Sequence, residues 1–531
     1  MRIVALLSVA IVLIAAAEPE IKVETDFTSE YNVVVFINDV GTDLGPELSI
    51  IEKAIAGYNQ IDPRAGNTLT VIPFPHHLSK KLIYSSTGSL RDDLKDSRDI
   101  YKAARAALER CYSLNLKKIL LVVGPFKTAM ADYTWAQGIY PKLTAAMGAL
   151  HALYVPLQVR EETSLRQKFD VLGLYGFEEK LKEAVVALAK GEAVHRDIGD
   201  SDPERMAAPM IADYLKAKEK DWNAAGITME IVPVNETRHP LAYAVGRATE
   251  TYEPHKGRVV YLTYTPEGPV DQTILLVGKG ITIDTGGADL KVDGVMYGMH
   301  SDKMGGAMVA GFFETLSHLK PKGLKVFGYM AFVRNSIGKN AYLPDEILIT
   351  RNGKRVRIGN TDAEGRLDMA DILDEARLQA MKSINPHIFT IATLTGAATR
   401  SFGTLTVSMD NGPARLVKMA ESLSDAGDMI ADPSEVARIR YEDFQVNYPL
   451  SDWEDVMQFN DKPGATSNRG FTFPMGFMCI ASDLDKHGCA SDHPIPYTHS
   501  DIAGSAGGIG TLATGSPLRM YANRFILPRV L

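Results

Sequence analysis

Apolar and polar positions along the chain follow two different periods, which predict strands and helices in turn. Short apolar runs predict buried strands, and residues 118–124 (KILLVVG) are the clearest of them. Apolar residues at helical spacing predict a helix over residues 97–114. Buried strands that alternate with helices are typical of a parallel or mixed sheet that is covered on both faces. The other predicted strands are 32–37, 68–73, 228–234, 259–264, 272–277, 325–333 and 387–393, and the other predicted helices include 49–56, 176–190, 305–319 and 367–381.

This order of elements predicts an α/β protein with two domains. A chain of 531 residues is longer than a single hydrophobic core usually needs. Residues 18–176 are expected to form an N-terminal mixed-sheet α/β module, and residues 177–194 a linker helix. Residues 195–531 are expected to form a second α/β domain, with a central sheet flanked by helices.

The first residues have the pattern of a secretory signal. Met1-Arg2 is followed by an apolar run over residues 3–17 and then by Glu18-Pro19-Glu20. Because a membrane span needs ~20 apolar residues, we predict a cleaved signal peptide at residues 1–17 and no membrane span after its removal. The protein is therefore expected to be secreted or endo-lysosomal. The alternative is a cytoplasmic protein in which this run is an ordinary terminal helix or strand.

Composition narrows the function classes. With 45% hydrophobic and 23% charged residues, the chain resembles ordinary soluble globular proteins. The formal net charge of -8 argues against nucleic-acid binding, which depends on clustered lysine and arginine. The three cysteines form no CxxC pair, so a thiolate zinc site is not indicated.

The densest group of reactive residue types lies in residues 277–306, VGKGITIDTGGADLKVDGVMYGMHSDKMGG. Lys279 and Asp284 are predicted to lie just past the end of a buried strand, which is where open α/β sheets place ligands. Asp302 precedes Gly305-Gly306, where the next helix is expected to begin. One lysine and two carboxylates are therefore expected at the loop ends of one sheet.

A second such group lies in residues 360–367, NTDAEGRL, where Asp362 and Glu364 are followed by Arg366. Taken singly, each carboxylate would more often cap a helix or face solvent. Together, several carboxylates suit divalent cations, and shared carboxylates are what two ions ~3.5–4 Å apart require. The chain contains no HExxH sequence, which argues against the one-zinc helix motif.

These two segments resemble the leucyl aminopeptidase family of cocatalytic two-metal peptidases, in the part of the chain from about residue 195 to 531. NTDAEGRL is the signature of that family. The spacing also matches, with Lys279 and Asp284 five residues apart, Lys291 seven further on and Asp302 eleven beyond that. Additional landmarks are residues 392–396 (ATLTG), 501–504 (DIAG) and Thr514-Gly515. The resemblance implies a hydrolase that releases N-terminal residues from peptides by a water activated by two metals.

The resemblance also implies a role for each residue. The tighter metal site would be formed by Lys279, Asp284, Asp302 and Glu364, and the more exchangeable site by Asp284, Asp362 and Glu364, with Zn or Mn as the expected ions. Lys291 would stabilise the oxyanion. Arg366 would hold a bicarbonate that serves as general base, in a cradle completed by Gly365 and Leu394. The first substrate side chain, Leu-like or otherwise apolar, would lie against Met299, Asn360, Thr393, Gly396, Ala503 and Ala506.

Two positions depart from the family pattern. Lys303 stands between Asp302 and Met304-Gly305-Gly306, which is expected to shift the helix start, and Asp368 takes a position that is usually apolar. A homohexamer is expected from the resemblance alone, whereas a secretory signal is atypical of a mainly intracellular family. The alternatives are a catalytically silent homologue of the same fold and a nucleic-acid-binding regulator, which the negative charge disfavours.

Overall fold

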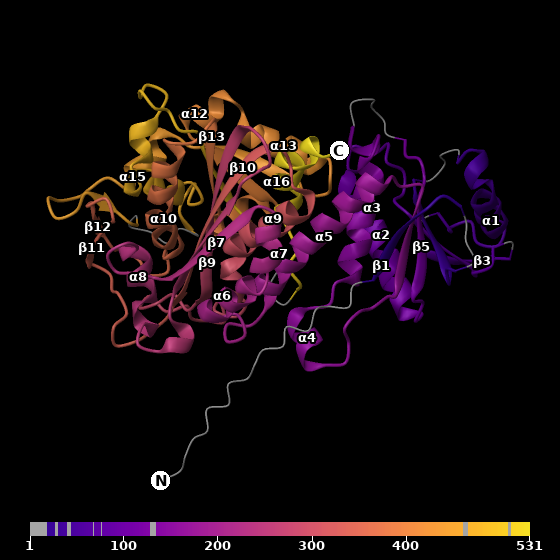
Figure 1. The fold of residues 1–531 in the computed structure, drawn as a ribbon, viewed down its shortest axis with the longest axis horizontal. Coiled ribbons are helices and arrows are strands. Elements are labelled where there is room, and N and C mark those ends of the chain that lie inside the picture. Colours follow the sequence, from indigo (N-terminus) through magenta and orange to yellow (C-terminus); the bar gives the residue numbers. More distant parts are fainter. Residues whose placement is uncertain are drawn as a thin grey trace, which may run out of the picture.

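The computed structural model describes residues 19–26, 30–39, 44–66, 68–75, 77–127, 134–459, 466–507 and 511–531. These residues form two lobes, each built on a mixed β-sheet with helices packed against it (Figure 1). The predicted fold class, with an N-terminal sheet module and a second α/β unit around a central sheet, is confirmed. The predicted signal segment, residues 1–17, lies outside the described residues.

The N-terminal lobe contains a six-stranded sheet, in the described residues, with the order β1-β6-β5-β2-β4-β3. Neighbouring strands are parallel except β3 and β4, which are antiparallel. The strands are β1 (Glu20–Glu24), β2 (Val33–Asn38), β3 (Thr70–Phe74), β4 (Lys80–Ser86), β5 (Lys118–Val123) and β6 (Val171–Tyr175). Its helices are α1 (Ser49–Asn59), α2 (Ser97–Ser113), α3 (Tyr140–Leu153) and α4 (Leu157–Glu162).

The C-terminal lobe contains an eight-stranded sheet, in the described residues, with the order β15-β14-β17-β13-β9-β10-β8-β7. Its central strands β13, β9 and β10 are parallel, so their carboxyl ends meet at the same edge. The strands are β7 (Ile227–Pro233), β8 (Arg258–Tyr264), β9 (Val270–Asp284), β10 (Gly323–Asn335), β13 (Pro386–Ala392), β14 (Thr406–Asp410), β15 (Ser434–Arg438) and β17 (Tyr497–Asp501). A small separate sheet is formed by β11 (Ile347–Ile349), β12 (Arg355–Arg357) and β16 (Val456–Met457).

Helices cover both faces of the larger sheet because side chains of β9 alternate between two cores. Ile274 and Leu276 belong to the core that includes α9, and Leu275 and Val277 to the core that includes α10. The helices of this part are α5 (Glu179–Asp200), α6 (Ala208–Lys216), α7 (Glu219–Ala224), α8 (Pro240–Gly246), α9 (Met304–Leu319), α10 (Gly365–Ala380), α11 (Gly396–Phe402), α12 (Gly412–Leu416), α13 (Met419–Asp428), α14 (Tyr441–Gln445), α15 (Phe473–Ala481) and α16 (Leu518–Phe525). Among the described residues, no helix has the length and apolar character that crossing a membrane requires.

Strand β9 is longer than the sequence pattern predicts. The apolar run ends at Val277, but the strand continues to Asp284, so Lys279 lies inside the strand rather than beyond it. The ladder with β10 continues along this segment. A Cβ atom at Gly280 would lie 2.1 Å from the carbonyl oxygen of Ala331, so the strands can approach here only because residue 280 is glycine. Polar side chains interrupt the apolar pattern that predicts a strand here, and these side chains form part of the site described below.

Helix α5 lies between the two lobes and is also longer than predicted (Figure 1). The linker helix was predicted to end at residue 194, but α5 continues through the charged residues Arg196 and Asp197 to Asp200. The charges do not end it because they are paired. Arg160 Nη2 lies 2.6 Å from Asp197 Oδ2, and Tyr214 donates to the same oxygen at 2.9 Å. The domain limits at residues 176 and 195 stay a prediction.

A buried ion-pair network joins α5 to α16. Glu192 in α5 accepts from Arg196 Nη2 at 2.8 Å and also pairs with Arg519 of α16. All three side chains are at most 4% exposed. Replacing Glu192 with alanine would leave two buried guanidinium groups without their carboxylate, and this carries a cost of about 3–5 kcal/mol.

We therefore expect Glu192→Ala to lower the unfolding midpoint strongly in thermal and urea melts. The matched control is Glu109→Ala, which removes an exposed pair with Arg105 in α2, worth about 0.3–0.5 kcal/mol. Equal midpoints for the two variants would contradict a structural role for the buried network.

Candidate active site

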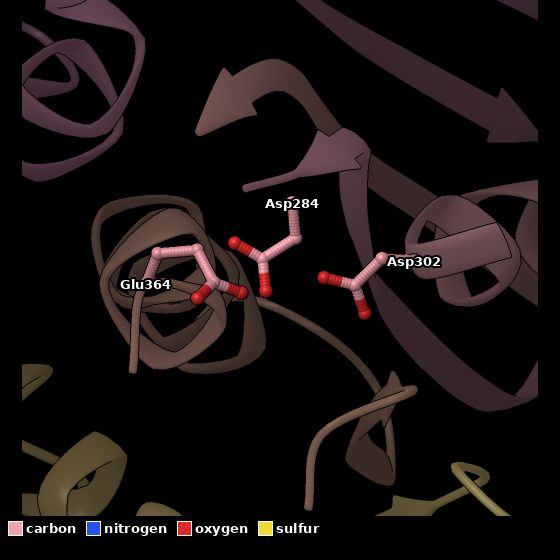
Figure 2. A group of neighbouring side chains, drawn as sticks. All are labelled: Asp284, Asp302 and Glu364. Atoms are coloured by element: carbon pink, nitrogen blue, oxygen red, sulfur yellow. The ribbon is translucent and has the colours of Figure 1, made fainter. Parts of the chain in front are cut away.

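Three carboxylates from separate elements meet at the carboxyl edge of the larger sheet. Asp284 ends β9, Asp302 lies in the short 3₁₀ helix Met299–Lys303, and Glu364 is the N-cap residue of α10. One oxygen from each lies within 4.8 Å of the others, and Figure 2 shows the carboxylates pointing toward one another. All three residues are buried. The structure therefore brings together three of the predicted metal ligands.

Two lysines compensate the charge of these carboxylates. Lys279 Nζ lies 2.7 Å from Asp302 and 2.9 Å from Glu364 Oε1. Lys291 Nζ lies 3.0 Å from Asp284 Oδ2 and also contacts Asp362. Burial lowers the pKa of both ammonium groups, but the surrounding carboxylates outweigh it and hold both pKa values above their usual range. Both lysines are therefore charged at neutral pH.

The carboxyl groups repel one another in spite of these lysines. Burial, followed by the charges of Asp284 and Glu364, raises the pKa of Asp362 to about 7. Burial also raises the pKa of Asp302 and Glu364. Among the described residues, Glu364 Oε2 is buried and has no hydrogen-bond partner. This cluster is thus rich in oxygen donors and favours additional positive charge.

Two glycines allow the elements of the site to approach closely. A Cβ atom at Gly365 would lie 2.4 Å from Cε of Lys279, so a larger residue at the first position of α10 would displace this lysine side chain. A Cβ atom at Gly305 would lie 2.0 Å from the carbonyl oxygen of Ile391, where α9 crosses β13. The glycine of NTDAEGRL therefore lies where a larger side chain would collide with Lys279.

The sequence pattern did not single out Asn335, which ends β10 beside the end of β9. Its Nδ2 donates to Asp284 Oδ1 at 2.7 Å and to the carbonyl oxygen of Thr361 at 3.0 Å. The Thr361 hydroxyl in turn donates to the Gly286 carbonyl at 2.6 Å and accepts from Asp289 N at 2.8 Å. The sequence did offer a signal for Asn335, because residues at the carboxyl ends of adjacent parallel strands lie together at one edge of the sheet.

The loop after β13 is fixed from two sides. Thr393 donates its hydroxyl to Asp302 Oδ1 at 2.8 Å, and its carbonyl accepts from Lys279 Nζ at 2.9 Å. Asp501, at the end of β17, accepts from Leu394 N at 3.2 Å and from Ala503 N at 3.1 Å. The landmarks ATLTG and DIAG are therefore joined directly by hydrogen bonds.

Arg366 lies in the first turn of α10 and is buried. Its Nη1 donates to the carbonyl oxygen of Gln458 at 2.9 Å, and its Nε has no hydrogen-bond partner among the described residues. Burial lowers its pKa to about 10, so the guanidinium remains charged at neutral pH. Its predicted cradle partners are Gly365, next to it in α10, and Leu394, which is half-buried on the loop after β13.

The residues predicted to contact the substrate side chain differ in exposure. Ala506 is buried in the main hydrophobic core, and Gly396 is exposed at the start of α11. The other four, Met299, Asn360, Thr393 and Ala503, are half-buried. Asn360 Oδ1 accepts from Asp362 N at 2.7 Å, which places it beside a predicted ligand. The substrate-binding role of the six residues stays a prediction.

Both departures from the family pattern are buried. Lys303 donates from Nζ to the Ser201 carbonyl at 3.0 Å and to the His300 carbonyl, and α9 begins at the next residue. Burial lowers the pKa of Lys303 to about 7. Asp302 nevertheless lies in the carboxylate cluster. Asp368 accepts from Gly280 N at 3.1 Å, and burial raises its pKa well above the usual range.

Residues 193–522, more than half of the chain, match the model of the catalytic domain of the cytosol aminopeptidase family. The chain belongs to the cytosol aminopeptidase family. This membership confirms the resemblance to leucyl aminopeptidases that the two motif segments indicate.

Relatives extend the match beyond this domain. A Caenorhabditis elegans protein named as a candidate aminopeptidase is 38% identical over 494 residues, covering 91% of this chain and 92% of the relative. A Persephonella marina protein named as a cytosol aminopeptidase is 34% identical over 347 residues, covering 62% of this chain and 61% of the relative. The bottromycin maturation enzyme BotP, solved in complex with Mn, aligns with a TM-score of 0.72 at 19% identity, covering 93% of this chain and 98% of that chain. At this identity BotP shows a shared fold.

The Thr361 contacts generate a prediction for stability. Thr361→Val removes the hydroxyl and leaves the Gly286 carbonyl and Asp289 N without this partner, which costs about 1–3 kcal/mol. We expect a lower unfolding midpoint in a denaturant titration. The control is Thr228→Val on an exposed position of β7, for which a change within about 0.5 kcal/mol is expected. Equal midpoints would show that these hydrogen bonds do not hold the loop.

Proposed function

We propose that the protein is a metal-dependent aminopeptidase that releases N-terminal residues from peptides. The observation that carries this proposal is the buried group of Asp284, Asp302 and Glu364, whose oxygens lie within 4.8 Å of one another beside Lys279. Membership of the cytosol aminopeptidase family supports the same activity. The intact set of predicted ligands argues against a catalytically silent homologue.

The residues present fit two divalent ions. Lys279, Asp284, Asp302 and Glu364 would hold one ion, and Asp284, Asp362 and Glu364 the other. Hard oxygen ligands with one nitrogen suit Mn or Zn. Glu364 Oε2 is buried without a hydrogen-bond partner in the part of the chain that the structure describes, so it is available as a metal ligand. Lysine binds a metal only as the neutral amine, so Lys279 would have to lose the proton that its carboxylate neighbours now stabilise.

When bound, the two ions would lower the pKa of a water molecule and polarise the scissile carbonyl. The charged Lys291 ammonium, held by Asp284 and Asp362, would stabilise the negative charge that develops on the carbonyl oxygen. Arg366 would hold a bicarbonate that accepts the proton from the attacking water. Its Nε is buried and has no hydrogen-bond partner within the described residues, so it is available to donate to such an anion.

The substrate preference is proposed from the six residues named above that are predicted to contact the first substrate side chain. Mostly apolar or small, they favour an N-terminal residue with a Leu-like side chain, whose burial stabilises the complex by ~1.5–3 kcal/mol.

We also propose that the protein is secreted or endo-lysosomal and assembles as a homohexamer. N-terminal sequencing of the mature protein and light scattering after size-exclusion chromatography test these two proposals. A retained Met1, or a stable monomer, would contradict them.

A substrate panel tests the activity. The purified protein is assayed on aminoacyl fluorogenic substrates with Mn, Zn, Co or Mg, and hydrolysis is expected to be greatest for leucyl and similar apolar residues. Glu364→Ala should lower kcat/KM by more than about 100-fold. Replacing a residue that only hydrogen-bonds to a metal ligand already lowers metal affinity or activity by about 10–100-fold.

The matched control is Glu375→Ala on the same helix α10, where Glu375 pairs with Arg238 away from the carboxylate cluster. This variant should keep the activity. Failure of the metal-loaded protein to exceed Glu364→Ala on any substrate would rule out the proposed function.

Metal binding should depend on pH. Burial and neighbouring carboxylates raise the pKa of Asp362 to about 7, so this group keeps its proton below neutral pH in the metal-free protein. Metals bind the deprotonated form, so binding releases protons and the apparent affinity rises between about pH 6 and 8. Titration calorimetry of Mn²⁺ binding in buffers of different ionisation enthalpy counts these protons. Binding without proton release would show that Asp362 and Lys279 keep their protonation states.

A further inference from the structure

The side chain of Gln458 makes four hydrogen bonds to one loop of the site. Gln458 directly follows the short strand β16 and is completely buried. Its Oε1 accepts from Gly359 N and from Asn360 N, both at 3.1 Å. Its Nε2 donates to the Asn360 carbonyl at 2.7 Å and to the Ala363 carbonyl at 2.9 Å. A primary amide offers two donors and one acceptor oxygen with two lone pairs, so its full capacity is used here.

These four contacts enclose the loop that carries the predicted ligands. Asp362 lies between two of the bonded residues, and Glu364 follows Ala363 directly. Within the loop itself, Ala363 N donates to the Asn360 carbonyl at 3.2 Å, and Asp362 N donates to the Asn360 side chain at 2.7 Å. The loop is not part of a strand, so much of its shape depends on the amide of Gln458.

The main chain of the same residue contacts Arg366. The Gln458 carbonyl accepts from Arg366 Nη1 at 2.9 Å, while Gln458 N donates to the Arg357 carbonyl at 3.0 Å and so continues the pairing of β16 with β12. One residue therefore contacts the ligand loop with its side chain and the predicted catalytic guanidinium with its backbone.

We propose that Gln458 is a positioning residue, which fixes the loop carrying Asp362 and Glu364 relative to the guanidinium of Arg366. The proposal rests on the proposed function, because it gives these three residues their roles. It assigns no contact with substrate to Gln458. Gln458 acts through the loop and through Arg366. The distance between the loop and the Arg366 guanidinium must be maintained if both are to act on one substrate.

The chemistry of this position requires an amide of this length. A glutamate would keep the two acceptor bonds but would direct a carboxylate oxygen at the carbonyls of Asn360 and Ala363. A methionine has a similar shape and makes none of the four bonds. Gln458→Met therefore removes the contacts while it largely preserves the packing.

Asn447 provides a matched control on the same segment. It is also completely buried, and its Nδ2 donates to the Met457 carbonyl at 2.9 Å, one residue before Gln458. Asn447→Leu therefore removes a buried amide that supports β16 without reaching the ligand loop. A purely structural effect of the segment should appear in both variants.

The first experiment compares the two variants in the full-length protein. Gln458→Met is expected to lower kcat/KM by roughly 10²-fold, as small misplacements of reacting groups do, and to retain less Mn²⁺ in equilibrium dialysis. Asn447→Leu is expected to lower the unfolding midpoint but to keep kcat/KM and Mn²⁺ retention per folded molecule. Wild-type values of both quantities in Gln458→Met, or equal losses in the two variants, would overturn the proposal.

The second experiment is a double-mutant cycle with Arg366→Ala. If Gln458 acts partly by holding Arg366, Gln458→Met should cost clearly less in kcat when Arg366 is already absent. Asn447→Leu and Arg366→Ala should have independent effects. Multiplicative losses for Gln458→Met with Arg366→Ala would exclude the coupling.

Two further outcomes are informative. If Gln458→Met does not fold, Gln458→Glu, which keeps the two acceptor bonds, is measured in the same way and is expected to show the same losses in part. If the wild-type protein shows no metal-dependent hydrolysis, the proposed function fails, and Mn²⁺ retention alone decides whether Gln458 positions the ligand loop.

Discussion

The repulsion among buried carboxylates at the edge of the larger sheet is the constraint on which the rest of the site depends. One oxygen from each of Asp284, Asp302 and Glu364 lies within 4.8 Å of the others, and all three residues are buried. Burial raises the pKa of Asp302 and Glu364, so nearby positive charge is needed to favour their ionised forms. Lys279 supplies part of that charge in this structure, and divalent ions would supply more. The charge deficit is therefore the physical reason for expecting a metal centre here.

The fold holds this unfavourable arrangement by distributing it over separate elements. Parallel strands bring the ends of β9, β10 and β13 to one edge, and α9 and α10 begin against that edge through Gly305 and Gly365. Amide and hydroxyl groups then complete the geometry. Asn335 fixes Asp284 from one side, and Gln458 fixes the loop before α10 from the other. The ligands are thus oriented by neutral groups, which add no further charge to the cluster.

Features of the fold and of the site could be predicted where their signal lies in neighbouring residues of the sequence. The α/β class and most of the buried strands followed from apolar periodicity. NTDAEGRL predicted Asp362 and Glu364 as ligands, and Glu364 lies in the carboxylate cluster. The end of β9 was predicted too early, because Lys279 and Asp284 are polar residues in a strand that is buried by its neighbours. Periodicity cannot distinguish a polar residue paired inside a site from one that faces solvent.

The positions that sequence reasoning missed are joined to the site only by long-range contacts. Gln458 lies about one hundred positions after the loop that it holds, in a short segment without a recognisable motif. Asn335 carried a weak signal as the last residue of a strand beside β9. Asp302 lies in the cluster although Lys303 separates it from Met304-Gly305-Gly306, because the lysine is buried against the backbone of Ser201 and His300. The sequence alone could not show where that ammonium would go.

The positions of bound Mn²⁺ ions would show whether this carboxylate cluster is a metal centre. Crystals soaked in Mn²⁺ and measured at a wavelength with strong manganese anomalous scattering would show any ion as a separate peak. We expect two peaks per chain about 3.5–4 Å apart. One would be bounded by Asp284, Asp302 and Glu364, with Lys279 Nζ as a further ligand. The other would be bounded by Asp284, Asp362 and Glu364. No peak at this edge at saturating Mn²⁺, with Lys279 still paired to Asp302 and Glu364, would contradict this expectation.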